Sequence, residues 1–392
     1  MVQVVAKTGN EAMAEAMRQI NPDVVAAYPI TPATEIVMIF SQFVADGLVN
    51  TQYVPVESEH SAMSATIAAS AAGARAMTGT SSQGLALMYE LLPIASALRL
   101  PIVMPEVNRA LSGPINIHND HSDTFAARDF GWIQIFSENS QEAYDNMLQA
   151  VRIAEHPKVK LPTMVTTDGF IISHCLEKIE IFEDDVVKDY VGKFPAYTNL
   201  LDLKNPVTLG ALDLQNYYFE HRRQTAEAMK SAKEIILEVG KDFGKKFGRE
   251  YGFFEEYKMD DAEMAMVCLG SIAGSAKSVV DEYREKGVKV GLMKIRVYRP
   301  FPAEEMAAVL ERMKAVVVVE KADGLAAKGG PLFDEIRSAL YDKKKKPAII
   351  DFIVGLGGRE VTHKHLNEIF DELKDLAATG TVKELIQYKG VR

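Results

Sequence analysis

Short apolar runs alternate with segments of helical apolar spacing through the first 176 residues. Apolar runs of about four to eight residues are typical of buried strands, and apolar positions recurring every three or four residues are typical of helices. The predicted strands are 24–28, 53–56, 75–80, 101–107, 132–136 and 161–166. The predicted helices are 11–18, 35–46, 58–72, 84–98 and 141–155. This alternation predicts an α/β fold with an open parallel sheet covered by helices on both faces.

A second series of the same kind begins near Met264. Its predicted strands are 265–269, 288–297, 315–320 and 349–354, and its predicted helices are 274–286, 303–313, 331–341 and 363–376. These elements predict a smaller open α/β domain. The stretch between the two series is charged and less regular, with a long polar helical segment over 216–246. Such a helix has three possible interpretations: it bridges two domains, it packs on a partner, or it is a solvated connection. We therefore divide the chain into residues 1–176, 177–261 and 262–392.

Composition and charge narrow the class of protein. An apolar share of 47% and a charged share of 25% are typical of a folded protein. The net charge of −10 argues against nucleic acid or an anionic membrane as partner. No signal-peptide pattern and no membrane-spanning run is present, so we expect a cytoplasmic protein. The two cysteines, Cys175 and Cys268, are too few for a disulfide framework or for an iron–sulfur cluster held by this chain alone.

Four polar strings follow predicted strands of the first series. They are Tyr28 to Pro32, Glu57 to His60, Thr80 to Gly84, and Asn108 to Pro114. In an open parallel sheet, ligands bind at the carboxyl ends of the strands. The four strings therefore mark the candidate site.

Each string has two interpretations. Glu59 opens a helix, so its carboxylate, like that of Glu57, either interacts with the helix dipole or faces a ligand nitrogen. The turn 80–84 either presents N–H groups to an anion or merely caps the next helix. Arg109 opens a loop, where it holds a substrate carboxylate or forms a structural ion pair.

A polar cluster in the following loop offers possible metal ligands. It consists of His118, Asp120, His121 and Asp123. Loops rich in Asn, Asp and His are commonly turn-formers, which is the alternative interpretation. The chain has no phosphate-binding loop of the Gly-x-x-x-x-Gly-Lys type, no Gly-x-Ser-x-Gly nucleophile elbow, and only an incomplete dinucleotide fingerprint at 355–358.

Taken in order and with their spacing, these strings resemble the alpha subunit of the multi-subunit pyruvate:ferredoxin oxidoreductases. The resemblance continues through 118–123, 129–132, 299–302 and 355–359, so it covers essentially the whole chain. It implies a thiamine-diphosphate domain of the pyrimidine-binding type, followed by a smaller domain like the C-terminal domain of transketolases, to which we assign assembly rather than chemistry.

The family builds its active site between two chains. One chain holds the pyrimidine, and the other holds the diphosphate through Mg²⁺ and carries a Gly-Asp-Gly motif. The nearest string here, Thr167-Asp168-Gly169, lacks the leading Gly. The resemblance therefore implies that this chain is the pyrimidine half and holds no metal itself.

The resemblance also implies roles for individual residues. Glu59 matches the catalytic carboxylate that hydrogen-bonds the pyrimidine and favours its imino tautomer, which then deprotonates the thiazolium carbon. Thr31 and Arg109 match the residues that bind the substrate. Tyr28, Pro29 and Ser82 fall at positions that contact the cofactor, together with Glu59.

The implied reaction is the oxidative decarboxylation of pyruvate with coenzyme A to acetyl-CoA and CO₂. Electrons pass through [4Fe-4S] clusters in partner subunits to ferredoxin, and the implied partners are beta, gamma and delta-type subunits. No second cation lies within 29–32, which favours a small monocarboxylate over a diacid. Three alternatives stay open: another 2-oxoacid, including oxalate; a non-catalytic assembly subunit; and a transketolase-like transferase without redox function.

Overall fold

A seven-stranded sheet forms the first domain of the chain. The computed structural model describes residues 2–197, 199–325 and 328–392. In the order of the sheet, the strands are β12 (Val297–Arg299), β6 (Ile133–Phe136), β7 (Thr163–Asp168), β5 (Val103–Asn108), β4 (Ala76–Met77), β2 (Val24–Ala27) and β3 (Gln52–Pro55). All neighbours run parallel except β12, which pairs antiparallel with β6. The predicted open parallel sheet is confirmed.

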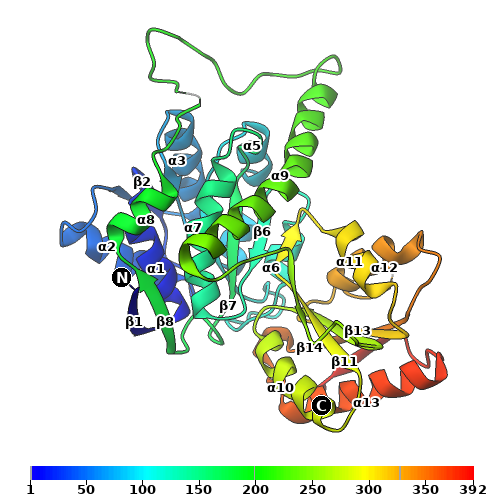
Figure 1. The fold of residues 1–392 in the computed structure, drawn as a ribbon. Helices are drawn as coiled ribbons and strands as arrows, with labels where there is room; N and C mark the ends of the chain where they lie inside the picture. Colours follow the sequence, from blue (N-terminus) through cyan, green and yellow to red (C-terminus); the bar gives the residue numbers. More distant parts are fainter. Residues whose placement is uncertain (1, 198, 326–327) are drawn as a thin grey trace.

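Helices cover both faces of this sheet (Figure 1). One face carries α1 (Gly9–Ile20), α2 (Thr34–Ala45) and α7 (Ser140–Ala154), and the other carries α3 (Glu59–Ala71), α4 (Ser82–Leu87) and α5 (Leu92–Ala97). Strand β5 shows why both faces are buried. Val103 and Val107 pack into the first core, whereas Met104 and Ile102, the residue just before the strand, pack into the second. Alternate residues of a strand face opposite sides, so a largely apolar run fits between two helical layers.

The single helix predicted over 84–98 is wrong. Two short helices, α4 and α5, occupy this stretch, with turns between Leu87 and Leu92. Pro93 lies in the first turn of α5. Proline lacks the N–H that a continuing helix needs and is tolerated only near a helix start, so a new helix begins here.

The second domain is a six-stranded sheet. In order, its strands are β15 (Ile386–Lys389), β14 (Ala348–Val354), β13 (Ala315–Glu320), β10 (Met264–Leu269), β11 (Val290–Ile295) and β9 (Phe254–Tyr257). Only β9 runs antiparallel to its neighbour. Helices α10 (Ile272–Glu285) and α13 (His363–Thr379) cover one face, and α11 (Ala303–Leu310) and α12 (Pro331–Tyr341) cover the other. This matches the predicted smaller α/β domain.

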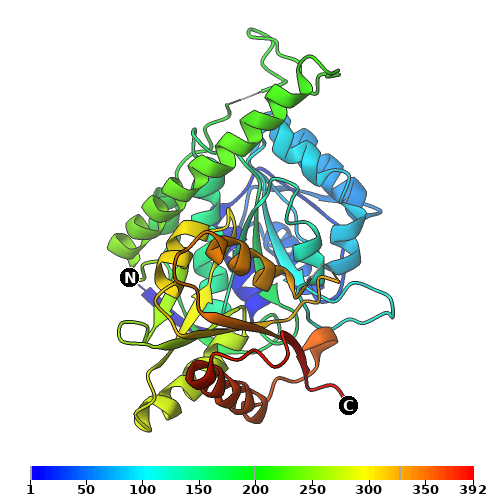
Figure 2. The ribbon, with the colours of Figure 1, turned by 90° about the vertical axis from the view of Figure 1, so that its right-hand side faces the viewer.

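A strand and a long helix help to tie the domains together. The predicted strand 288–297 ends at Ile295, and residues 297–299 instead form β12 in the first sheet. The long polar helix is α9 (Tyr218–Phe247), which crosses the first domain diagonally (Figure 2). Its Lys233 pairs with Glu304 and Glu305 of the second domain. Of the interpretations offered for this helix, the structure favours the domain bridge.

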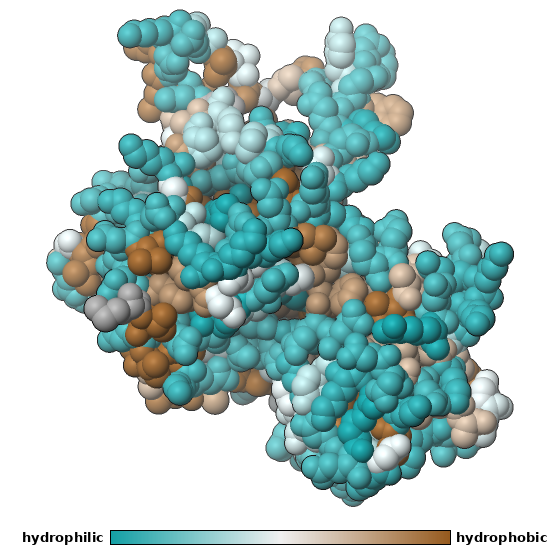
Figure 3. Space-filling model, in the orientation of Figure 1, coloured by the Kyte–Doolittle hydropathy of each residue, from teal (hydrophilic) through white to brown (hydrophobic). Residues whose placement is uncertain are grey.

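The remaining elements lie around this bridge. Strands β1 (Val2–Lys7) and β8 (Glu177–Phe182) form a two-stranded antiparallel sheet, followed by α8 (Asp184–Val191). The short α6 (Ser122–Ala126) and the 3₁₀ turn η1 (Leu356–Gly358) lie in the loops after β5 and β14. Residues 199–217 project from the body (Figure 1). The face in Figure 3 is mostly hydrophilic with small scattered apolar groups. Within the described part of the chain, no helix has both the length and the apolar character needed to cross a membrane.

Candidate active site

The four polar strings meet at one edge of the first sheet. They follow β2, β3, β4 and β5, and these strands are neighbours in the order β5-β4-β2-β3. Because the four strands are parallel, their carboxyl ends lie together. The topology therefore gathers the predicted site residues as the sequence pattern indicated.

Glu59 is the first residue of α3 and is only 7% exposed. Ser58 caps this helix by accepting a hydrogen bond from the Ser61 N–H. Among the described residues, the Glu59 carboxylate has no hydrogen-bond or ion-pair partner. Glu57, by contrast, is exposed at the surface and accepts a hydrogen bond from the Ser61 hydroxyl. A carboxylate that is enclosed but unpartnered is suited to a ligand, so the structure separates two residues that the sequence pattern left equivalent.

Gly84 brings the start of α4 close to Glu59. A Cβ at this position would overlap the Thr80 hydroxyl and would come within 2.8 Å of Glu59 Oε1. Only glycine leaves room for both groups. The Glu59 carboxylate and the Thr80 hydroxyl therefore both lie against the side of Gly84 on which a Cβ would project.

Arg109 is positioned by carbonyl groups rather than by an acid. Its Nε donates to the Asn116 carbonyl at 2.9 Å, and its Nη1 donates to the Thr31 carbonyl at 3.0 Å. The side chain is largely buried, and no carboxylate of the described residues pairs with it. This excludes the structural ion pair within that part of the chain. It leaves an oriented guanidinium whose charge is not neutralised, next to Thr31.

Ser82 links two of the strings. Its hydroxyl is buried and donates to the Ala110 carbonyl at 2.7 Å, so it ties the turn after β4 to the loop after β5. Its backbone has a φ of 46°, in the left-handed region. Tyr28 is half-buried and Pro29 is exposed, both just after β2. The cofactor contacts of these three residues stay predictions.

The four possible metal ligands after β5 point to separate partners. Asp123 accepts backbone hydrogen bonds from Ser82 and Arg109, and His121 pairs with Asp168. Asp120 accepts from the Ser122 and Gly357 N–H groups, and the His118 ring lies 5.0 Å from that of Phe170. Their arrangement supports the turn-forming interpretation.

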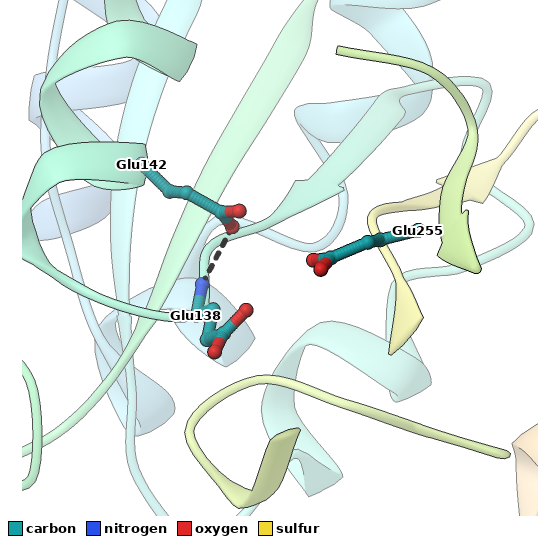
Figure 4. A group of neighbouring side chains, drawn as sticks. All are labelled: Glu138, Glu142 and Glu255. Carbon is teal, nitrogen blue, oxygen red and sulfur yellow. Dashed lines mark hydrogen bonds between the residues drawn. The ribbon is translucent and has the colours of Figure 1, made fainter. Parts of the chain in front are cut away.

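A different group of carboxylates does converge, outside the predicted site. Glu138, Glu142 and Glu255 bring oxygens within 4.8 Å of one another (Figure 4). The Lys294 ammonium lies between them, 3.1 Å from Glu138 and 3.2 Å from Glu255, and also contacts Glu142. Lys277 pairs with Glu138 and Glu255 as well. Two ammonium groups thus occupy the positions that a cation would take, and the cluster joins the two domains.

Asp168 belongs to a second buried contact between the domains. It ends β7 and accepts from Lys321 Nζ at 2.7 Å, from His121 Nε2 at 2.8 Å and from the Ser271 hydroxyl at 2.5 Å. Burial opposes its ionisation, but the charges of Lys321 and His121 outweigh burial and hold the pKa of Asp168 well below its usual range. Asp168 is therefore a structural anchor, consistent with the incomplete Gly-Asp-Gly string around it.

The fold and this edge define a class of protein: an open α/β domain with a ligand site at the carboxyl ends of its parallel strands, joined to a smaller α/β domain. A 2-oxoglutarate:ferredoxin oxidoreductase from Magnetococcus marinus, solved with 2-oxoglutarate, coenzyme A and succinyl-CoA bound, superposes with a TM-score of 0.73 at 20% identity. The alignment covers 94% of this chain and 65% of that one. A split-gene transketolase superposes with a TM-score of 0.56 at 12% identity. These two likenesses concern the fold.

Sequence comparison fixes the family. Residues 15–241 match the family described as pyruvate flavodoxin/ferredoxin oxidoreductase, thiamine diphosphate-binding, and residues 262–366 match pyruvate:ferredoxin oxidoreductase core domain II. The chain belongs to the pyruvate:ferredoxin oxidoreductase family and is an alpha-type subunit of a thiamine-diphosphate-dependent 2-oxoacid:ferredoxin oxidoreductase. The family resemblance seen in the motifs is confirmed.

Three relatives illustrate the range of the family. The chain is 55% identical to pyruvate synthase subunit PorA of Thermotoga maritima, over 95% of each chain. It is 46% identical to PorA of Pyrococcus abyssi, covering 98% of this chain and 97% of that one. It is also 42% identical to ketoisovalerate oxidoreductase subunit VorA of Pyrococcus horikoshii, over 97% and 96%. Since these relatives are named as subunits, this chain works in a multi-subunit complex.

One buried acidic residue in the sheet next to the site was not predicted from the sequence. Glu106 lies in the middle of β5 and is completely buried. The signal was present, because Glu106 is the one charged residue in the apolar run from Pro101 to Val107. A carboxyl inside a strand that is buried on both faces needs a partner or a proton.

Proposed function

We propose that this chain supplies the pyrimidine half of a thiamine diphosphate site for the oxidative decarboxylation of pyruvate. The observation that best supports this proposal is the contrast between Glu59 and Glu57. Glu59 is enclosed and unpartnered at the carboxyl edge of the sheet, while Glu57 is exposed and hydrogen-bonded. Thiamine diphosphate fits this arrangement, because its ring nitrogen provides the donor or acceptor that Glu59 lacks. When bound, the cofactor supplies the nucleophilic carbon that attacks the 2-oxo group.

Glu59 acts by exchanging a proton at its carboxyl oxygens. One oxygen lies against Gly84, within a largely buried site. In such surroundings the carboxyl holds a proton toward a ring nitrogen in one state and accepts it back in the other, with little competition from water. Loss of the titratable proton at Glu59 removes this function while the shape of the site is kept.

Arg109 and Thr31 orient the 2-oxoacid. Two carbonyl groups fix the Arg109 guanidinium through Nε and Nη1. Its remaining N–H groups are free to bind the substrate carboxylate, and a fixed cation selects for an acid at this point. Thr31 is exposed beside Arg109, which leaves its hydroxyl available to the keto oxygen.

Partner subunits complete the proposed enzyme. A beta-type subunit holds the diphosphate through Mg²⁺, since Asp168 of this chain is already engaged with Lys321 and His121. Gamma and delta-type subunits and ferredoxin complete the electron path, with [4Fe-4S] clusters in the partners. Cys175 is exposed and Cys268 is buried, and two cysteines do not bind such a cluster. Coenzyme A is the acyl acceptor; it is bound in the Magnetococcus structure.

The test uses the complex assembled with its natural partner subunits under anaerobic conditions. We expect pyruvate-dependent, coenzyme A-dependent reduction of a viologen dye by the wild-type complex, loss of this activity in Glu59→Gln, and near-normal activity in the matched control Glu57→Gln. Faster turnover of 2-oxoisovalerate, the substrate class of the VorA relative, would overturn pyruvate but keep the site. Equal activity of the Glu59→Gln and Glu57→Gln complexes would contradict the assignment of Glu59.

A further inference from the structure

Glu106 is a buried carboxyl with no visible donor. It lies in β5, where Thr80 is its partner on the β4 side and Thr166 its partner on the β7 side. Partnered residues of parallel strands point to the same face, so these side chains form a polar row inside the sheet. Among the described residues, no donor has hydrogen-bond geometry toward either oxygen of Glu106, and the hydroxyls of Thr80 and Thr166 also lack partners. The Ser82 N–H acts on Glu106 as well, but it donates to Asp123.

A second carboxyl, that of Asp123, lies on the same side of β5: Asn108, two residues after Glu106 in the strand, donates to it, and its charge acts on Glu106. Asp123 Oδ2 accepts the backbone N–H of Ser82 at 3.1 Å and that of Arg109 at 2.9 Å. Its Oδ1 accepts from Asn108 Nδ2 at 3.0 Å and from the Thr124 N–H at 2.7 Å. Burial raises the pKa of Asp123, but the four donors directed at its carboxylate oppose that shift and stabilise its charged form.

Two adjacent buried carboxylates cannot both ionise readily. Burial, followed by the charge of Asp123, raises the pKa of Glu106 well above its usual range. The hydrogen bonds single out Asp123 as the ionised member and leave Glu106 as the acid. A proton on Glu106 directed at Asp123 also gives Glu106 the hydrogen-bond partner that its other contacts lack.

We propose that Glu106 carries a proton that it shares with Asp123, and that this acid–carboxylate pair is a positioning device for the active-site edge. Through Asp123, the pair fixes the backbone of Ser82 in the turn after β4 and that of Arg109 in the loop after β5. The role of Arg109 toward the substrate rests on the proposed function. The shared proton itself does not.

The Glu106–Asp123 pair lies next to the carboxyl edge of the first sheet, where the candidate site is. Thr80, its neighbour in the polar row, contacts the same Gly84 backbone as Glu59 does. Tyr89 and Asp120 are the other titratable groups near Asp123: the Tyr89 hydroxyl donates to the Asp123 carbonyl at 3.2 Å, and the charge of Asp120 acts on the Asp123 carboxyl. A change at Glu106 therefore reaches the Ser82 turn and Arg109 without direct contact with substrate.

The first test compares two substitutions in the assembled complex. Glu106→Gln keeps a donor toward Asp123, and Glu106→Met fills the space without one. We expect Glu106→Gln to keep the pyruvate KM within about twofold, and Glu106→Met to raise it about tenfold with a much smaller change in kcat, because a loosened Arg109 weakens substrate binding in all states alike. Thr163→Val, at the amino end of β7 and equally buried, is the matched control and should leave KM unchanged. An unchanged KM in Glu106→Met would overturn the positioning role.

The second test detects the proton directly and does not depend on activity. The infrared difference spectrum between the wild-type and Glu106→Gln complexes at neutral pH should contain the carbonyl band of a protonated carboxyl, shifted in deuterated water. Absence of that band would overturn the shared proton, even if Glu106→Met failed to assemble. A wild-type complex without pyruvate activity that still showed the band would instead overturn the proposed function and leave the pair in place.

Discussion

The contact between the domains and the candidate active site both contain buried charges, but they treat them in opposite ways. Between the domains, Asp168 meets Lys321 and His121, and Lys294 meets a trio of glutamates. At the carboxyl edge of the first sheet, Glu59 has no partner and Arg109 is held only by carbonyls, among the residues that the structure describes. Burying a charge is costly unless it is paired. Paired charges here serve assembly, and unpaired ones await a ligand.

The largest effect is expected from a substitution of Glu59, the unpaired carboxylate of the candidate site. Glu59→Gln should lower kcat by about 100-fold or more, the usual contribution of a positioned acid–base group. The free energy of unfolding should change little, because the carboxylate makes no contact that the amide would lose. Steady-state dye reduction and urea unfolding measure the two quantities. A stability loss with normal turnover would place Glu59 with the paired charges instead.

Removing one partner of a buried charge pair between the domains should instead lower the free energy of unfolding. Lys321→Met leaves Asp168 buried without its ammonium partner and should lower the free energy of unfolding by about 3–5 kcal/mol. The exposed pair of Lys158 and Glu234 offers the control, and Lys158→Met should cost less than about 0.5 kcal/mol. Urea unfolding of the purified chain measures both.

The pH dependence of the Asp168–Lys321 pair follows from the direction in which the pKa of Asp168 is shifted. The pKa of Asp168 is lowered in the folded chain, so its contribution is present above the unfolded pKa of 3.8 and is lost only in stronger acid. We therefore expect the Lys321→Met deficit to be the same at pH 6 and pH 8. A deficit that vanished at pH 6 would contradict this pairing.

A smaller effect should come from Arg109. Arg109→Lys keeps the charge but loses the planar fork, and it should raise the pyruvate KM about tenfold or more. Arg99 is also held by two carbonyls, those of Val159 and Lys160, but lies before β5 at the opposite edge. Arg99→Lys should therefore leave KM unchanged. Equal KM values for the two variants would show that carbonyl-held arginines are generic structural features of this fold.

The smallest effect is expected from two buried carboxyls in the second domain. Asp351 and Glu320 are buried carboxyls that accept the Gly330, Leu332 and Phe333 N–H groups at the start of α12. Burial raises the pKa of Asp351 from 3.8 to about 7. The folded chain then keeps a proton that the unfolded chain has lost, so stability falls as pH rises from about 4 to about 7.

This slope can be measured by urea unfolding at several pH values. Between pH 6 and pH 7 Asp351 should contribute a fall of about 1 kcal/mol in the free energy of unfolding, and Asp351→Asn should make the curve shallower by that amount. A variant curve with the same slope as the wild type would show that Asp351 ionises normally. These carboxyls have backbone partners, so they cap a helix and do not mark a second ligand site.

The sequence predicted six strands of the first sheet and four of the second, because most of them are largely apolar runs that only a doubly covered sheet can bury. It did not predict β9, β15 or the small sheet of β1 and β8, because polar or charged residues interrupt each of these strands. It also predicted which loops meet at the site, since parallel strands place their carboxyl ends together. Strand β12 could not be foreseen, because its residues read as the end of the preceding strand, and only tertiary pairing with β6 assigns them to the first sheet.

The partners of the buried charged residues could not be predicted from the sequence either. Periodicity indicates that Asp168 and Asp123 lie at strand or loop ends, but the groups they meet are far away in the chain, such as Lys321, 153 residues from Asp168. The same limit kept Glu57 and Glu59 equivalent in the sequence. Only the fold shows that one is solvated and the other enclosed against Gly84.

The proton chemistry that Glu59 is proposed to control can be measured directly on the cofactor. In the assembled complex with bound thiamine diphosphate, the exchange of the thiazolium carbon proton with deuterated water can be followed by NMR after acid quench. We predict rapid exchange in the wild type and in Glu57→Gln, and exchange slowed by about 100-fold or more in Glu59→Gln. Equally rapid exchange in all three complexes would contradict the assignment of this chain as the pyrimidine half of the site.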